Sequence, residues 1–183
     1  MARVPYLRPD DLPEPGRSVL EGYRVNLFEA LANAPEAMVH LHALGTWIRE
    51  GQSLPARARE LAILQVGVSA RSPYAFSHHV RIGMAHGLTP DDVRAVTAPN
   101  GPERAALAPL EAAALDAARE ITEEGSLAED RWAALAERLD ERQRVELVVT
   151  VAFYNAVVRM LAALEIDLEP EHEALLREHP LPS

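Results

Sequence analysis

The chain has 183 residues, a formal net charge of −10 and a hydrophobic content of 48%, values that suit one soluble globular domain. It contains no cysteine, which excludes disulfides, thiolate nucleophiles and cysteine-ligated metal or iron–sulfur centres. All 18 basic residues are arginine, so Schiff-base and covalent pyridoxal phosphate chemistry have no lysine to use. The aromatic content is only 5% and Ala and Leu are abundant, so we predict an all-α fold.

The acidic excess lies in the second half of the chain, where residues 101–183 hold eight Arg against eighteen acidic residues. Residues 1–100 hold ten of each, and no basic cluster stands out. Because phosphate neutralisation supplies most nucleic-acid affinity, we expect no nucleic-acid partner. The first residues lack a hydrophobic signal core and no apolar run approaches about 20 residues, so we expect a cytoplasmic protein that does not enter a membrane.

The first sixteen residues contain four prolines: Pro5, Pro9, Pro13 and Pro15. This density disfavours a helix, so residues 1–16 are predicted to form an extended arm on a single domain that spans 1–183. The sequence leaves open whether the arm lies on its own subunit or on a neighbour.

Apolar residues recur at helical spacing from Val19 to Arg49, and Ala34-Pro35 divides this stretch into two predicted helices. The next helix is predicted to begin near Pro55 and carries apolar residues on more than one face. We therefore expect that helix to be buried on several sides.

Ser72-Pro73 has the pattern of an N-cap followed by the first helical residue, and the helix that it opens is expected to run to Gly87. Thr89 opens the following helix in the same way, with acidic residues in the first turn.

We predict a loop over 97–109 and helices over 110–124, 126–139 and 142–164. Ser126 and Glu129 have the spacing of a capping box at the start of the second of these helices. Charged residues interrupt the last one, which is predicted to be a core helix and not a membrane span. The total is about eight helices.

Glu60 and His79 flank the predicted bend at Arg71-Ser72. At 1.5 Å per residue, Glu60 lies roughly 15 to 18 Å before the bend and His79 roughly 10 Å after it, so antiparallel packing would bring them to one pocket. An imidazole exchanges a proton near neutral pH, and a nearby carboxylate orients it and stabilises its charged form. We predict His79 as general acid/base and Glu60 as its partner; a purely structural hydrogen bond is the alternative.

Three motifs carry a resemblance to a known family: Glu60-Leu61, Tyr74-x-Phe76-x-x-His79 and Gly87-Leu88-Thr89. They resemble the carboxymuconolactone decarboxylase family, which belongs to the alkylhydroperoxidase D-like superfamily. Residues 26–35 and 152–159 are also similar, so the resemblance covers nearly the whole chain. It implies a compact multi-helix bundle of that type and a homo-oligomer, a trimer or a hexamer built from trimers.

The peroxidase branch of the superfamily carries two cysteines at the positions of Ser72 and Ala75. Neither residue cycles between thiol and disulfide, so hydroperoxidase activity is the least supported function. The decarboxylase branch implies loss of CO₂ from a small lactone-type acid, with a proton delivered to the resulting carbon and no cofactor. A non-catalytic small-molecule-binding or scaffolding protein that keeps the fold is the alternative.

Four residues are candidates for substrate binding: Arg57, Ser72, Tyr74 and Phe76. Arg57 is proposed as a carboxylate clamp, against an ion pair within its helix. The other three have structural alternatives, a core contact for each aromatic ring and an N-cap for the serine. His78 lies about 100° around the helix from His79 and is expected at the surface or a subunit contact. No zinc or di-iron helix pattern occurs, so no metal site is predicted.

Overall fold

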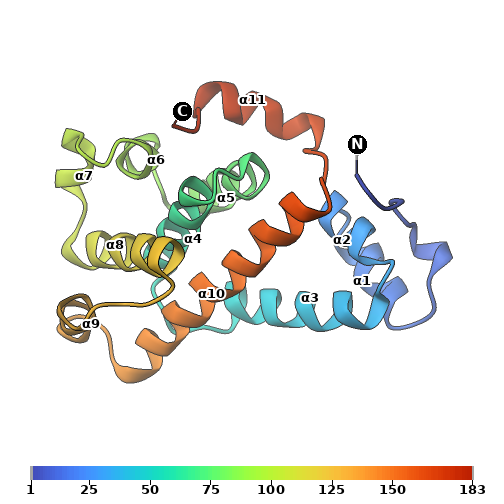
Figure 1. Cartoon of the computed structure of the whole chain (residues 1–183), viewed down its shortest axis with the longest axis horizontal. Helices are drawn as coiled ribbons and strands as arrows, with labels where there is room; N and C mark the ends of the chain where they lie inside the picture. Colours follow the sequence, from blue (N-terminus) through green and yellow to red (C-terminus); the bar gives the residue numbers. More distant parts are fainter. Residues whose placement is uncertain (1, 183) are drawn as a thin grey trace.

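The computed structural model describes residues 2–182, and within them it contains helices and loops but no strand (Figure 1). A 3-10 helix at Pro9–Asp11 precedes α1 (Gly16–Gly22), α2 (Asn26–Leu31), α3 (Pro35–Glu50), α4 (Ala56–Ser69), α5 (Pro73–Ala85), α6 (Pro90–Thr97), α7 (Pro102–Ala106), α8 (Pro109–Glu124), α9 (Glu129–Ala136), α10 (Glu141–Ala163) and α11 (Pro170–Glu178). Nine of these α-helices have seven residues or more. The predicted all-α class is confirmed.

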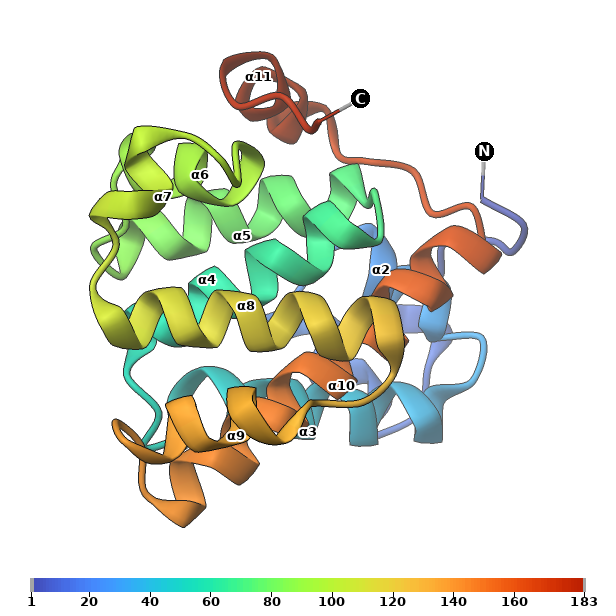
Figure 2. The same cartoon turned by 60° about the vertical axis from the view of Figure 1, so that its left-hand side comes forward.

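Helix α4 lies at the centre of the bundle and is buried along ten consecutive residues, 58–67. It packs against α5, α6, α8 and α10, and Figure 2 shows α8 running alongside α4. The apolar residues on several faces of this helix predicted that burial. Its position brings the side chains of α4 against α5 and α10, two helices that line the cavity described below.

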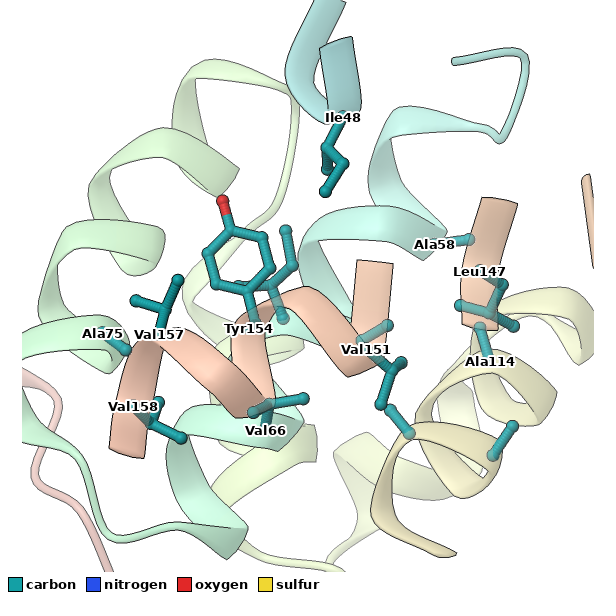
Figure 3. Packing of buried hydrophobic residues seen from close by; sticks show 14 of the residues in the cluster. Ile48, Ala58, Val66, Ala75, Ala114, Leu147, Val151, Tyr154, Val157 and Val158 are labelled. Atoms are coloured by element: carbon teal, nitrogen blue, oxygen red, sulfur yellow. The ribbon is translucent and has the colours of Figure 1, made fainter. Parts of the chain in front are cut away.

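The long helix α10 supplies one wall of the main core. Figure 3 shows Leu147 and Val151 of this helix packed toward Ala114 of α8. By length and composition alone α10 is apolar enough to cross a membrane, with a mean hydropathy of 1.6 over its most apolar 18 residues. In this structure it packs against α3, α4, α5, α8 and α9, as expected of a core helix.

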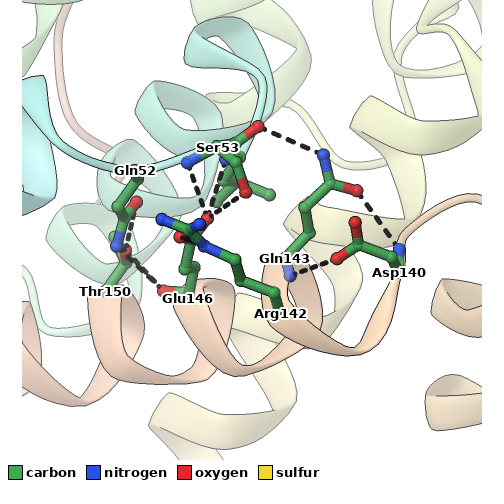
Figure 4. A network of polar contacts seen from close by, with 8 residues as sticks. Gln52, Ser53, Asp140, Arg142, Gln143, Glu146 and Thr150 are labelled. Carbon is green, nitrogen blue, oxygen red and sulfur yellow. Dashed lines mark hydrogen bonds and ion pairs between the residues drawn. The ribbon is translucent and has the colours of Figure 1, made fainter.

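Glu146 ties α10 to the loop that leads into α4 (Figure 4). Its buried carboxylate accepts hydrogen bonds from the backbone N–H groups of Ser53 (2.8 Å) and Leu54 (2.9 Å) and from the Ser53 hydroxyl. Arg142, one turn earlier on α10, donates to the other carboxylate oxygen. Buried backbone donors need such partners, so this network fixes where α4 begins relative to α10.

The proline-rich arm lies against its own chain. Arg3 donates its backbone N–H to the carbonyl of Leu164, and Leu7 donates to the carbonyl of Glu29. The Tyr6 hydroxyl contacts the Asp167 carboxylate at 3.0 Å. The described part of the arm, from residue 2, therefore closes over the end of α10 and over α2.

Several helix boundaries differ from the sequence-based predictions. The first predicted helix is interrupted at 23–25, which separates α1 from α2, and the predicted loop over 97–109 contains the short helix α7. The capping box at Ser126 is absent: α9 begins at Glu129 after Ala128, whose N–H is taken by Glu120, and it ends at Ala136. Helix α11 was not predicted.

The predicted caps of α5 and α6 are confirmed. Ser72 Oγ accepts from the N–H of Ala75, and Thr89 accepts from the N–H of Asp92. Gly87, with φ of +88°, follows the end of α5 in the left-handed conformation that glycine adopts at low cost.

Candidate functional site

Glu60 and His79 meet between α4 and α5. Nδ1 of His79 lies 2.8 Å from Oε2 of Glu60, and both side chains are buried. The predicted antiparallel hairpin therefore brings the two residues together.

Two glycines allow α4 and α5 to approach closely enough for this contact. A Cβ atom on Gly67 of α4 would lie 3.2 Å from the backbone nitrogen of Phe76. A Cβ atom on Gly83 of α5 would lie 3.5 Å from Cβ of Glu60 and only 2.6 Å from the Leu88 side chain. A larger residue at Gly67 would press on the Phe76 backbone of α5, and one at Gly83 would displace the Leu88 side chain that packs beside Glu60.

Glu60 is held in its ionised form. Burial raises the pKa of Glu60, but the hydrogen bond and charge of His79 and the nearby Arg59 outweigh burial, so the pKa lies below its usual value. Arg59 Nε donates to the second carboxylate oxygen at 3.1 Å. An ionised carboxylate only accepts, so Nδ1 of His79 carries the hydrogen and Nε2 is the nitrogen left for chemistry.

His79 also lines a cavity of about 60 Å³, room for a few water molecules and so for a ligand built on one small ring. Aromatic side chains form much of its wall: Tyr23, Phe28, Tyr74, Phe153 and Tyr154. The His79 ring meets the Tyr154 ring edge to face, with 4.7 Å between centroids. No hydrogen bond to Nε2 of His79 is found within residues 2–182.

Arg49, at the end of α3, is the arginine that lines this cavity. Its guanidinium lies over the Tyr23 ring, 5.3 Å from the centroid. Burial and the charge of Glu60 raise the pKa of Tyr154, and the charge of Arg49 offsets only part of that rise, so the phenol stays protonated at neutral pH. The cavity thus combines a fixed positive charge, a neutral phenol and the free nitrogen of His79.

The structure does not place Arg57 at the cavity. Its guanidinium forms ion pairs with Glu111 (2.7 Å) and Asp92 (3.0 Å) and also contacts the carbonyl of Gly87. These contacts hold α4 to α6 and α8. They occupy the guanidinium N–H groups that would otherwise bind a substrate carboxylate. The prediction of a carboxylate clamp at Arg57 is therefore wrong, and the arginine that lines the cavity is Arg49.

The other candidate residues divide between core and cavity. Phe76 is fully buried in a separate apolar cluster with Leu61 and Leu64, and Ser72 serves as the N-cap of α5. Neither side chain lines the cavity, so Phe76 is a core contact and Ser72 is an N-cap, as their structural alternatives predicted. Tyr74 does line it, and its hydroxyl donates to Glu169 and accepts from the N–H of Leu27.

The prediction for His78 was wrong. Its ring is buried, lines the same cavity, and places Nε2 2.9 Å from Oε2 of Glu169. Helix α11 packs across α5, as Figures 1 and 2 show, and its first turn covers the face on which His78 lies. That face is buried because α11, a helix that was not predicted, packs over it.

No group of three or more metal-ligating side chains is arranged to hold an ion among residues 2–182. The polar groups of the cavity are those of a proton-transfer or anion-binding site.

Known proteins share both the hairpin region and the overall fold. Residues 32–120 match the model of the carboxymuconolactone decarboxylase family. The chain superposes on a cysteine-to-alanine variant of the debrominase Bmp8 in complex with 2,3,4-tribromopyrrole with a TM-score of 0.82 and 20% identity, over 97% of each chain. The apo form of Bmp8 gives 0.81 and 21% identity over 96% of this chain and 97% of that one.

An uncharacterized peroxidase-related protein from Ralstonia eutropha JMP134, an alkylhydroperoxidase AhpD core, gives a TM-score of 0.79 with 20% identity over 93% of this chain and 94% of that one. At these identities the structural neighbours show the fold alone. Comparison with curated proteins gives no match. Residues 32–120, just under half of the chain, therefore match the carboxymuconolactone decarboxylase family, and the cysteine-less chain has an alkylhydroperoxidase D-like fold.

Proposed function

We propose that the protein is a cofactor-independent, decarboxylase-like enzyme that acts on a small anionic or lactone-type organic acid. The observation that carries this proposal is the placement of His79, which lines the cavity while its Nδ1 is tied to the ionised Glu60. A carboxylate in this position stabilises the imidazolium, the form that gives a proton. Arg49 supplies the charge that an anionic substrate needs.

The reaction would proceed by heterolysis of the bond between the carboxyl carbon and the ring carbon. CO₂ leaves, and the electron pair passes through the double bond into the lactone carbonyl to form a dienolate. Arg49 and the neutral hydroxyl of Tyr154 stabilise the oxygen of that dienolate. His79 then delivers the proton from Nε2 to carbon and is reprotonated from water.

The shape of the cavity supports a small planar substrate. Its walls are aromatic and aliphatic, and its volume limits the ligand to about one ring. A protein of the same fold, the Bmp8 variant, was solved with the single-ring ligand 2,3,4-tribromopyrrole. The present chain has no cysteine, so a reaction at this site has to use the imidazole, guanidinium and phenol groups.

A panel of small lactone acids tests the proposal, with CO₂ release and deuterium incorporation from D₂O as readouts. We expect the wild-type protein to release CO₂ from at least one compound and to place deuterium on the carbon that carried the carboxylate. His79→Gln should lower kcat by about 10²–10⁴-fold, whereas the exposed His40→Gln should behave as wild type. Full turnover by a folded His79→Gln variant would overturn the assignment.

A non-catalytic binding protein is the second candidate, and the largely apolar lining of the cavity favours it. Such a protein would bind panel members without changing them. Retention of an intact lactone acid at stoichiometric occupancy, with no deuterium exchange over hours, is the result that would establish binding over catalysis.

We also propose a homo-oligomer, a trimer or a hexamer. Leu44 and Trp47 lie on the outer face of α3 with 41% and 38% of their surfaces exposed, large apolar side chains that a second copy could cover. Light scattering that returned the mass of one subunit would rule this out.

A further inference from the structure

A second histidine–carboxylate pair lies at the cavity, formed by His78 of α5 and Glu169. His78 lies next to His79 on α5, and its Nε2 contacts Glu169, which precedes α11. The His78 ring is stacked between two others, 4.4 Å from Tyr74 and 3.7 Å from His172, at angles of 11° and 13°. This stack of three rings fixes the plane of the His78 ring.

Glu169 determines which nitrogen of His78 carries the hydrogen. Burial raises the pKa of Glu169, but hydrogen bonds from His78, the N–H of Asn26 and the Tyr74 hydroxyl lower it to about 2. The carboxylate is therefore ionised at neutral pH and accepts the hydrogen on Nε2 of His78. Nδ1 of His78 has no hydrogen-bond partner within the described residues, 2–182, and is the nitrogen that can exchange a proton.

The neighbouring ring repeats this arrangement with its nitrogens exchanged. His79 gives Nδ1–H to Glu60 and keeps Nε2 free, whereas His78 gives Nε2–H to Glu169 and keeps Nδ1 free. Both rings line one cavity, together with Arg49. Decarboxylation uses one proton donor, so it leaves the second pair without a role.

We infer that His78 is a second proton-transfer residue of this cavity and that the site also moves a proton between two carbons of a β,γ-unsaturated lactone. The inference rests on the proposed proton transfer by His79 and extends it to isomerisation. The substrate class is a small lactone whose dienolate Arg49 can stabilise.

The isomerisation conserves all atoms. One imidazole, in its neutral form, removes the proton on the carbon beside the carbonyl, and the electron pair enters the carbonyl oxygen. The other imidazole, protonated, adds its proton to the γ carbon, and the double bond moves into conjugation with the carbonyl. The two rings finish with their protonation states exchanged and are restored by solvent.

Conversion of α-angelica lactone to its conjugated isomer, followed by absorbance and by NMR in D₂O, tests this step. We expect the wild-type protein to accelerate the conversion and to place deuterium on the γ carbon. His78→Gln and His79→Gln should each lower the rate by about 10²-fold or more. His40→Gln, which removes an exposed imidazole, should leave it unchanged.

The pH profile separates a chemical from a merely structural role. A reaction that needs one neutral and one protonated imidazole gives a bell-shaped kcat/KM. Glu169→Gln and Glu60→Gln should each change the shape of this profile, whereas His40→Gln should leave it as in the wild type. A folded His78→Gln variant that isomerises at the wild-type rate would overturn the inference.

A measurement on the unaltered protein covers the case in which the His78 variants do not fold. Two-bond ¹H–¹⁵N correlation spectra of the histidine rings should show His78 with hydrogen on Nε2 and a free Nδ1, and benzoate, used as a planar anionic probe, should shift the Nδ1 signal. A protonated Nδ1 that does not respond to bound benzoate contradicts the assignment. If the wild-type protein releases CO₂ but does not isomerise the lactone, the role inferred for His78 is wrong and the proposed function stands. If it catalyses neither reaction, the proposed function is wrong as well.

Discussion

Glu60 and His79 are 19 residues apart in the sequence and 2.8 Å apart in space, and Arg59 binds the opposite oxygen of the same carboxylate. The three side chains form a buried line of alternating charge when His79 is protonated. One nitrogen of Arg59, Nη2, is buried without a partner among residues 2–182, so the pair with Glu60 is its main compensation. The relationship is therefore structural as well as chemical.

Glu60→Gln should lower the free energy of unfolding by about 3 kcal/mol, because it leaves the buried Arg59 charge uncompensated. Urea denaturation at pH 7 measures this. The double variant with Arg59→Gln is the control, because it removes the orphaned charge. We expect its destabilisation to be smaller than the sum of the two single changes, and simple additivity would argue against coupling between these groups.

Acid should weaken the attachment of α11 through Glu169. The pKa of this carboxyl group is about 2 in the folded protein and near 4.5 when the group is free. Between pH 2 and 4.5 the folded state therefore binds fewer protons than the unfolded state. Its contribution is fully present above about pH 4.5 and is lost as the pH falls toward 2. Allowing for partial solvent screening, we expect roughly 2 kcal/mol.

Glu169→Gln removes that titration. The variant should be less stable than wild type at pH 7 and should approach the wild-type value as the pH falls toward 2. Thermal unfolding at a series of pH values measures the difference. A constant gap between the two proteins across this range would show that Glu169 has the same pKa in the folded and unfolded states.

The hairpin could be predicted from the sequence because its signals are local. Ser72 and Gly87 mark the ends of α5, and the rise per residue places Glu60 and His79 at similar heights. Such arguments need only residues that are close in the chain. The three motifs that resemble a known family lie in the same stretch, inside the matched residues 32–120, whereas the similar residues 152–159 lie outside it.

Residues brought in by distant elements could not be predicted in this way. Arg49 reaches the cavity because α3 crosses near α10, and His78 is buried because α11 returns over α5. No periodicity or cap specifies these crossings. Arg57 shows the reverse case, because its spacing from Glu60 predicted a role in the site but Asp92 and Glu111, from α6 and α8, hold it elsewhere.

The two arginines offer a matched comparison. Arg49→Gln should weaken benzoate binding by about tenfold or more, because a charge-assisted hydrogen bond is worth roughly 1.5–3 kcal/mol. Arg57→Gln should leave binding unchanged and lower stability by about 1 kcal/mol through its half-exposed ion pairs. Calorimetric titration with benzoate measures the affinities. Equal weakening by both variants would contradict the assignment of the anion site to Arg49.

Glu146 supports the site from outside the cavity. Glu146→Ala removes the acceptor for the backbone N–H groups of Ser53 and Leu54, and we expect it to lower the free energy of unfolding by about 2–4 kcal/mol. Benzoate affinity of the folded fraction should stay near that of wild type, because Glu146 does not line the cavity. A large loss of affinity without a loss of stability would show that the loop before α4 is part of the binding site.

Close packing at Gly83 should be as important to the site as its polar residues. A Cβ atom there would lie 2.6 Å from the Leu88 side chain and in ordinary contact, at 3.5 Å, with Cβ of Glu60, so Gly83→Ala should displace Leu88, cost about 1–3 kcal/mol and alter the packing beside the Glu60–His79 pair. Gly22→Ala is the matched control, because a Cβ atom at Gly22 meets nothing within 4 Å and alanine favours a helix. The control should be neutral or slightly stabilising. If Gly83→Ala also proves neutral and leaves the ring signals of His79 unchanged, the approach of the two helices does not depend on that glycine.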